Sequence, residues 1–196
     1  MAGPRKESWR KFLLPPTQRG TTQAMTHAPR TDPSQDVFHH LAARIAQSGL
    51  PHVVHVHAPT RTVAEAEANL DFDTSRIVKT IAFALRGGGL VLAALRGARR
   101  VAYPALAGLL GVGRRDLSAL SPDEVLARLG VAPGSVSPLL AQGRGKLLVD
   151  ADVLTIRPTV YCGLGRSDRT LEIAPGDLVA AAGGMGEVVV GEFSKG

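Results

Sequence analysis

Two apolar segments on either side of a glycine triplet constrain the fold of this chain more than any other feature of its sequence. Residues 77–85 (IVKTIAFAL) and 90–95 (LVLAAL) are rich in residues that favour strands, and residues 86–89 (RGGG) supply the backbone freedom of a tight reversal. We therefore predict an antiparallel hairpin.

Helices and strands are predicted in irregular alternation around this hairpin. Apolar residues recur at helical spacing after Ser34, and the sequence from Ser121 to Glu124 (SPDE) is a capping-box pattern that begins a helix. We expect helices over residues 34–49, 62–70, 104–110, 121–130 and 175–182. We expect further strands over residues 52–57, 146–149, 160–163, 170–173 and 188–193. This order predicts a single α/β domain with a mixed, largely antiparallel central sheet flanked by helices.

Length and composition allow one hydrophobic core and exclude several classes of protein. The chain has 196 residues, 44% of them hydrophobic and 20% charged, which is close to the average of globular domains. A single cysteine, Cys162, excludes an intramolecular disulfide and a multi-thiolate metal site, and is typical of a cytoplasmic protein. No apolar run approaches the roughly 18 residues of a membrane-spanning helix, so we expect no membrane partner.

The net charge of +6 is concentrated at the start of the chain. Residues 1–30 contain six basic residues and one acidic residue and account for +5, whereas residues 31–196 account for +1. Because residues 1–33 also lack helical or strand periodicity, we expect a disordered basic tail there and one folded domain over residues 34–196. Met25 is an alternative start that would remove most of the basic tail, and an intact mass would decide between the two starts.

One segment of the expected domain is basic as well. Seven basic residues and no acidic residue lie between Ile77 and Arg115. Such an imbalance attracts a polyanion, although arginines on solvated turns would give the same pattern.

Lys79 is the charged member of an apolar row. In an extended strand it points to the same face as Ile77, Ile81 and Phe83, whereas Thr80 points to the other face. Burial of an unpaired ammonium is strongly unfavourable. Lys79 therefore either reaches water at the strand edge or lies beneath a site for an anion or a polarised oxygen.

The segment Gly134–Pro138 (GSVSP) has residues that can present their backbone to a ligand. Glycine permits a close approach, and proline fixes its own backbone and favours an extended residue before it. Such a loop directs several N–H groups at one ligand oxygen, although the same residue types also mark ordinary turns.

Three of these segments together resemble the YbaK and prolyl-tRNA-synthetase-associated editing-domain family. They are residues 76–83 (RIVKTIAF), the loop over 134–138 (GSVSP), and residues 163–165 (GLG) leading to 170–178 (TLEIAPGDL). Their order and separation fit the family, and the resemblance covers roughly residues 36–193.

The resemblance implies a free-standing, YbaK-like enzyme that hydrolyses the ester between a wrong amino acid and its tRNA. Its partners would be aminoacyl-tRNA, most often tRNA for proline, and an aminoacyl-tRNA synthetase, and no cofactor or metal is expected. Small amino acids escape selection by size, and threonines in the expected pocket favour serine, threonine or alanine. The alternatives are a catalytically silent tRNA-binding or synthetase-associated module, and an esterase that acts on small aminoacyl esters without tRNA.

The resemblance also assigns the site residues. Lys79 corresponds to the family lysine, which would face the Gly134 bend and supply positive charge to the carbonyl oxygen, while amides around Ser135 and Val136 donate hydrogen bonds to it. No side-chain nucleophile is required. The expected catalytic residues are Lys79, Gly134 and Ser135, and the expected substrate-binding residues are Thr62, Thr80, Val136, Ser137, Pro138, Gly165 and Thr170.

Other chemistry-bearing residues have simpler interpretations. His55 and His57 share a strand face near His52, as two metal ligands would, but no third ligand is apparent, so we interpret them as structural or surface residues. Cys162 lacks the surroundings of a reactive thiol and is expected to be buried. The serines of the loop 134–138 lack identifiable histidine and aspartate partners for a hydrolase triad.

Overall fold

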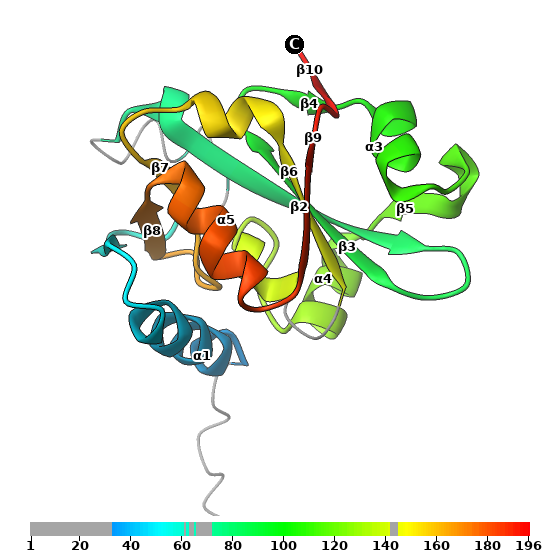
Figure 1. Ribbon diagram of the computed structural model, residues 1–196. Coiled ribbons are helices and arrows are strands. Elements are labelled where there is room, and N and C mark those ends of the chain that lie inside the picture. The colour runs from blue at the N-terminus through cyan, green and yellow to red at the C-terminus, as the bar shows by residue number, and fades with distance from the viewer. Residues whose placement is uncertain (1–32, 61, 63–64, 66–71, 142–144) are drawn as a thin grey trace, which may run out of the picture. The chain divides into compact units, whose positions relative to one another are not determined.

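The predicted hairpin lies in the middle of the sheet (Figure 1). In the computed structural model of the chain, β2 (Ile77–Leu85) pairs antiparallel with β3 (Leu90–Arg96), with Lys79 opposite Leu95. The three glycines of the turn have φ angles of 86°, 102° and 104°, a region that residues with a Cβ rarely adopt. The prediction of a hairpin is confirmed.

The structure describes most of the chain after its N-terminal segment, namely residues 33–60, 62, 65, 72–141 and 145–196. Residues Thr31–Gly196 form one compact unit. The expected tail lies outside the described residues except for Pro33, and so does most of the helix expected over 62–70. At the start of that helix, the Thr62 hydroxyl accepts a hydrogen bond from the amide of Glu65 at 3.0 Å.

Eight strands form one mixed sheet in the order β1-β8-β7-β2-β3-β6-β9, with β5 also paired to β2. The remaining strands are β1 (His52–Val56), β4 (Arg100–Val101), β5 (Leu117–Ala119), β6 (Lys146–Asp150), β7 (Val160–Gly163), β8 (Arg169–Ile173), β9 (Glu187–Gly191) and β10 (Ser194–Lys195). The pairs β1–β8, β8–β7, β2–β3 and β2–β5 are antiparallel, whereas β7–β2, β3–β6 and β6–β9 are parallel. β4 and β10 form a separate ribbon.

The mixed, largely antiparallel sheet is thus confirmed, while its short strands were not predicted. β4, β5 and β10 have two or three residues each, too few to show a period. The strand expected over residues 188–193 ends at Gly191 and so does not include Phe193. The Phe193 amide instead donates to the buried carboxylate of Asp150 at 2.8 Å.

Helices flank the sheet as predicted. Within the described residues they are α1 (Pro33–Gln47), α3 (Tyr103–Leu110), α4 (Pro122–Leu129) and α5 (Pro175–Gly183). The capping box of α4 is present, because the Ser121 hydroxyl accepts from the Glu124 amide and the Glu124 carboxylate accepts from the Ser121 amide. Short 3₁₀ turns occupy Thr74–Arg76, Arg114–Asp116, Pro138–Ala141 and Ala151–Thr155.

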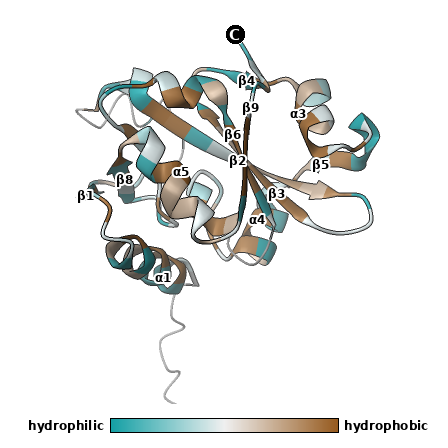
Figure 2. Ribbon diagram, viewed as in Figure 1, coloured by the Kyte–Doolittle hydropathy of each residue, from teal (hydrophilic) through white to brown (hydrophobic). Residues whose placement is uncertain are grey.

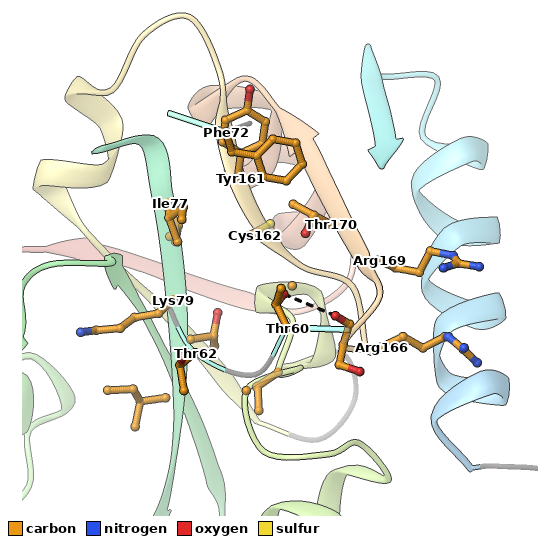
Figure 3. A pocket seen from close by; sticks show the side chains of 17 residues that line it. Thr60, Thr62, Phe72, Ile77, Lys79, Tyr161, Cys162, Arg166, Arg169 and Thr170 are labelled. Carbon is orange, nitrogen blue, oxygen red and sulfur yellow. Dashed lines mark hydrogen bonds between the residues drawn. The ribbon is translucent and has the colours of Figure 1, made fainter. Parts of the chain in front are cut away.

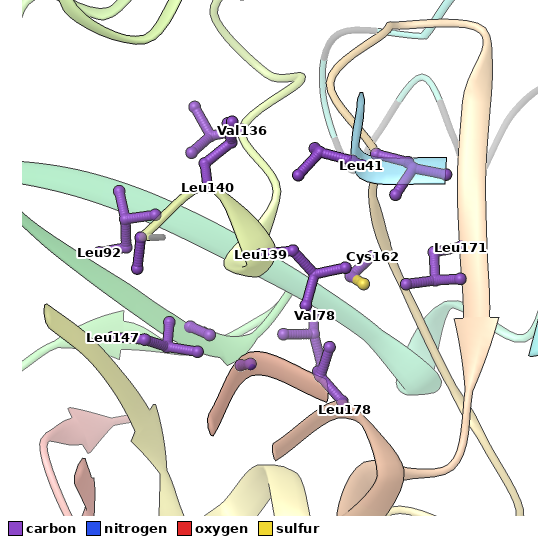
Figure 4. Close-up of a cluster of buried hydrophobic side chains, with 14 of the residues drawn as sticks. Leu41, Val78, Leu92, Val136, Leu139, Leu140, Leu147, Cys162, Leu171 and Leu178 are labelled. Carbon is purple, nitrogen blue, oxygen red and sulfur yellow. The ribbon is translucent and has the colours of Figure 1, made fainter. Parts of the chain in front are cut away.

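The two faces of the sheet carry separate hydrophobic clusters. In the first cluster, Val78, Leu92 and Leu147 of the sheet pack with Leu41 of α1 and Leu178 of α5 (Figure 4). The helix α4 and the turn that follows the loop 134–138 belong to the same cluster. This face of β2 is therefore the one on which that loop packs.

The second cluster lies between the opposite face and α3. Phe83, Val91 and Leu148 of the sheet pack with Leu106 of α3 and with Phe193. Figure 2 shows the hydrophobic residues concentrated along the central strands. No helix in the described part of the chain is long and apolar enough to span a membrane.

Candidate functional site

The edge of β2 opposite β3 is covered at both ends and open in the middle. β7 pairs with β2 at Ile77 and Val78, and β5 pairs with it over residues 83–85. Among the described residues, no strand pairs with this edge over residues 79–81. The sheet is therefore interrupted beside Lys79 and its neighbours.

The peptide groups of Thr80 face this open edge. The carbonyl of Ile77 accepts from the amide of Gly97 on the β3 side at 2.7 Å, whereas the carbonyl of Ala82 accepts from the amide of Leu120 on the other side at 2.9 Å. Because alternate residues of a strand direct their peptide groups to opposite edges, the N–H and C=O of Thr80 point to the same side as those of Ala82.

A cavity of about 300 Å³ lies at the open edge (Figure 3). It is lined by Lys79 and Thr80 from β2, by Gly134 and Val136 from the loop after α4, and by Thr170 from β8. Its volume is at the lower end of the range for small-molecule sites. Segments far apart in the sequence thus meet at one cavity.

Two glycines let the loop Gly134–Pro138 pack closely against the end of β7. A Cβ at Gly163 would lie 3.0 Å from the carbonyl oxygen of Val136. The amide of Gly165, whose φ is 86°, donates to the carbonyl of Ser135 at 3.1 Å. A side chain at either glycine would strain the backbone or displace the loop, so these glycines fix where the loop stands.

The ten residues expected at the site divide into those that line the cavity and those that support it. Residues that line it are Lys79, Thr62, Thr80, Gly134, Val136 and Thr170. Residues that do not line it are Ser135, Ser137, Pro138 and Gly165. Of these, the loop residues are buried, so they support the loop from behind.

The hydrogen-bond donors of the loop differ from those expected. The Ser135 amide donates to the carbonyl of Ala132 at 3.0 Å and is therefore already occupied. Gly134 and Val136 line the cavity, and within the described residues neither of their amides has an acceptor. The hydroxyls of Ser135 and Thr80 are buried and also have no partner in that part of the chain.

Lys79 does not direct its ammonium at the Gly134 bend. The side chain leaves β2 on the face of the second cluster, its Nζ donates to the carbonyl of Gly97 at 2.7 Å, and Figure 3 shows it pointing away from Thr170. The expected orientation is therefore not the one observed. The strand period gives the face of Lys79 but not the acceptor, which the turn after β3 supplies. Burial, and to a smaller extent the charge of Arg100, lowers the pKa of Lys79.

Two stacked rings contribute an apolar wall. The rings of Phe72 and Tyr161 lie 4.4 Å apart with an angle of 6° between their planes, and both line the cavity. The guanidinium of Arg76 lies 4.4 Å from the Tyr161 ring centre, a cation–π contact. No sequence pattern marked either ring, because they come from separate segments that the fold brings together.

Beside this wall, Glu172 of β8 contacts β1 and the segments that precede β2 and β7. Its carboxylate accepts from Arg76 at 2.8 Å and contacts the His55 ring nitrogen Nε2 at 2.7 Å. The hydroxyl of Thr159, which also donates to Glu172, is the main cause that lowers the pKa of this carboxyl, and His55 and Arg76 act in the same direction.

Arg166 in the β7–β8 connection and Arg169 at the start of β8 line the cavity as well. Arg166 and Arg169 pair with Asp168 at 2.8 Å and 2.9 Å. The hydrogen bond from Arg166 holds the pKa of Asp168 below its usual value. Figure 3 shows both guanidinium groups pointing away from Thr170 toward α1, where that of Arg169 lies 5.6 Å from the ring centre of Phe38, a cation–π contact.

His55, His57 and Cys162 do not form a metal site or an activated nucleophile among the described residues. His55 contacts Glu172, and Nε2 of His57 lies 2.9 Å from the hydroxyl of Thr170. In the described part of the chain, no group of three or more His, Cys, Asp and Glu side chains is placed to hold a metal ion. Cys162 is buried as predicted, and burial raises the pKa of its thiol to about 12.

Acidic residues from other segments offset part of the basic segment. Arg86 pairs with Asp116 at 3.3 Å, and Arg96 pairs with Asp152 at 2.9 Å. The positive charge seen in the sequence between residues 77 and 115 is therefore partly neutralised in the fold.

The comparison with protein families decides what this cavity belongs to. The sequence model of the aminoacyl-tRNA editing domain matches residues 57–181, which is more than half of the chain and includes every residue that lines the cavity. The chain belongs to the aminoacyl-tRNA editing domain family. No curated protein sequence matches this editing domain.

Solved structures share the fold of the editing domain. The hypothetical protein APE2540 is 32% identical, with a TM-score of 0.70, and the match covers 79% of this chain and 99% of that one. A proposed trans-editing enzyme for prolyl-tRNA synthetase is 26% identical, with a TM-score of 0.65, and the match covers 86% of this chain and 99% of that one. The family resemblance inferred from the sequence is confirmed.

Proposed function

We propose that this editing domain is a YbaK-like deacylase that hydrolyses the ester of mischarged aminoacyl-tRNA in trans. Family membership supports the editing role, and the relative assigned to prolyl-tRNA synthetase supports tRNA for proline as the carrier. The amino acid removed is serine, threonine or alanine. The corresponding synthetase is the partner whose errors are corrected, and the reaction takes place in the cytoplasm, where charged tRNA is used.

Two unpaired loop amides at residues that line the cavity carry this proposal. The amides of Gly134 and Val136 would donate to the ester carbonyl oxygen as it becomes negative, and fixed donors of this kind stabilise such a transition state. Water adds to the carbonyl carbon, the bond to the terminal ribose oxygen breaks, and that oxygen leaves with a proton from the water. The products are the free amino acid and the tRNA.

Lys79 acts on the carbonyl in this proposal only after a change of side-chain conformation. Its ammonium would exchange the Gly97 oxygen for the substrate oxygen, which replaces one charge-assisted hydrogen bond by another. Because Lys79 leaves β2 on the face opposite the loop, its flexible stem would have to turn around the open edge of the strand. We therefore propose that the Lys79 ammonium contacts the carbonyl oxygen only in the transition state, when that oxygen becomes negatively charged.

A deacylation panel tests the proposed function. The wild-type chain is mixed with alanyl-, seryl-, threonyl- and prolyl-tRNA for proline, and with alanine and threonine on their own tRNAs. Release of alanine, serine or threonine from tRNA for proline, with prolyl-tRNA left intact, is expected. Inactivity towards all substrates would contradict deacylation.

The second candidate is a catalytically silent tRNA-binding module. The bond from Lys79 to Gly97 favours it, because the ammonium is engaged outside the loop. Tight binding of aminoacyl-tRNA without any turnover in the same panel would select this candidate. Release from a small aminoacyl ester as fast as from tRNA would instead indicate an esterase that does not need tRNA.

A further inference from the structure

The hydrogen bonds of His57 determine which of its ring nitrogens carries the proton. Nδ1 lies 2.7 Å from the carbonyl oxygen of Ala58, and Nε2 lies 2.9 Å from the hydroxyl oxygen of Thr170. A carbonyl oxygen only accepts, so Nδ1 must donate. In a neutral imidazole the other nitrogen then has no hydrogen, and Nε2 must accept from Thr170.

This arrangement leaves the Thr170 hydroxyl with acceptor capacity alone. A hydroxyl has one hydrogen and two lone pairs. The hydrogen is directed to His57, so the lone pairs remain for a ligand, and Thr170 lines the cavity. His57 does not line the cavity and acts through Thr170.

Backbone contacts hold His57 in this position. Its amide donates to the carbonyl of Asp168 at 3.2 Å, and the amide of Thr60 donates to the carbonyl of Ser167 at 2.7 Å. The segment that follows β1 is thus joined at two points to residues 167–168, which precede β8. A ring held in this way fixes the direction of its partner hydroxyl.

We propose that His57 is a positioning residue that makes Thr170 an obligate hydrogen-bond acceptor, so that the cavity selects aminoacyl groups that present a donor to it. The donor is the α-ammonium or a side-chain hydroxyl of the amino acid. This inference rests on the proposed function for the nature of the ligand. It adds that Thr170 acts as a hydrogen-bond acceptor in the cavity and that His57 makes it one.

Binding of uncleavable substrates tests the proposal without turnover. The probes are adenosines that carry an alanyl, seryl or propionyl group through an amide at the 3′ position, and calorimetry measures their dissociation constants. Thr170→Val removes the hydroxyl and keeps the shape, and His57→Phe removes the acceptor nitrogen and keeps a ring. We expect each variant to weaken alanyl or seryl binding by about tenfold, the effect of one hydrogen bond to a charged or polar group.

The double variant separates positioning from independent contact. If His57 acts through Thr170, His57→Phe has no further effect once Thr170→Val is present. The control is His52→Phe at the start of β1, where the native ring contacts the carbonyl of Leu50. We expect this variant to bind the probes within about twofold of wild type. Thr170→Ser is expected to restore affinity.

The probes identify the donor. A loss with alanyl and seryl probes but not with propionyl identifies the α-ammonium, and a loss with the seryl probe alone identifies the side-chain hydroxyl. Unchanged binding of all three probes in Thr170→Val, or independent effects in the double variant, would overturn the proposal. So would nitrogen NMR showing a proton on Nε2 of neutral His57.

Turnover of the wild-type chain distinguishes a failure of the His57 positioning role from a failure of the proposed deacylase function. Inactivity with intact, His57-dependent probe binding overturns deacylation alone. Normal turnover with unaffected binding in both variants overturns the positioning role alone.

Discussion

The ammonium of Lys79 has one bond in this structure and a different one in the proposed reaction. Replacing Lys79 by alanine removes the positive charge from the carbonyl in the transition state. We expect deacylation to fall by about 10²–10³-fold, the usual cost of one such donor. Single-turnover measurements with mischarged tRNA check this. The free energy of unfolding should fall by only about 1 kcal/mol, because the variant loses only one hydrogen bond, the one to the Gly97 carbonyl.

Lys146 supplies the matched control for this variant. It also lies on a strand, and its ammonium pairs with Glu187 on the surface at 2.7 Å, away from the cavity. Lys146→Ala should leave deacylation unchanged. Near-normal turnover by Lys79→Ala would remove the lysine from the mechanism and leave the loop amides as its only donors.

At the scale of elements, Glu172 of β8 is joined to β1 through His55 and to the turn before β2 through Arg76. Its pKa is lowered in the folded protein, chiefly by the Thr159 hydroxyl. A carboxyl with a lowered pKa stabilises the fold above its unfolded pKa, and this stabilisation is lost as pH falls through the folded pKa. Glu172→Gln should therefore lower the free energy of unfolding by about 1–2 kcal/mol at pH 7. The difference should shrink as the pH falls below about 4.3, the unfolded pKa of a glutamate, toward the lower folded pKa.

Urea unfolding followed between pH 3 and pH 8 measures this dependence. Glu187→Gln is the control, because Glu187 pairs with Lys146 at an exposed position where an ion pair contributes little. A constant difference between Glu172→Gln and wild type across the whole range would contradict the role of the carboxylate charge.

Elements with a strong local pattern could be predicted from the sequence. The alternation along Ile77–Leu85 and its glycine turn gave the bounds of β2 and the start of β3, and the SPDE pattern gave the start of α4. The ribbon of β4 and β10 could not be predicted, because each strand has two residues and the pairing joins segments about a hundred residues apart.

The site was predictable in its segments but not in its hydrogen bonds. The family motifs brought Lys79, Gly134 and Thr170 to one cavity. The acceptor of Lys79 and the partner of Thr170 depend on how β3 and β1 meet their neighbours. Contacts of this kind form between distant segments, and no local spacing in the sequence specifies them.

At the scale of the whole molecule, the domain organisation inferred from charge remains a prediction. Residues 1–30 carry a net charge of +5 and residues 31–196 a net charge of +1. Deleting residues 1–30 should leave the unfolding midpoint unchanged, because residues Thr31–Gly196 form a compact unit of their own. It should weaken tRNA binding at 50 mM salt by on the order of tenfold and reduce its salt dependence, since fewer phosphates are neutralised.

Filter binding between 50 and 200 mM salt, together with thermal unfolding, tests both parts. A lower unfolding midpoint would show that the first residues belong to the domain. An unchanged salt slope would show that the basic tail takes no part in binding tRNA.

The gap in strand pairing along one edge of β2, between β7 and β5, has a consequence for how such a domain can evolve. At this open edge the main-chain groups of Thr80 are left without a strand partner, while residues of β7, β8 and the loop 134–138 line the rest of the cavity. Mutations can therefore change the side chains that line the cavity, and with them the preferred amino acid, while the main-chain groups of Thr80 stay the same. One scaffold can in this way give rise to a lineage of proofreaders that differ in what they discard.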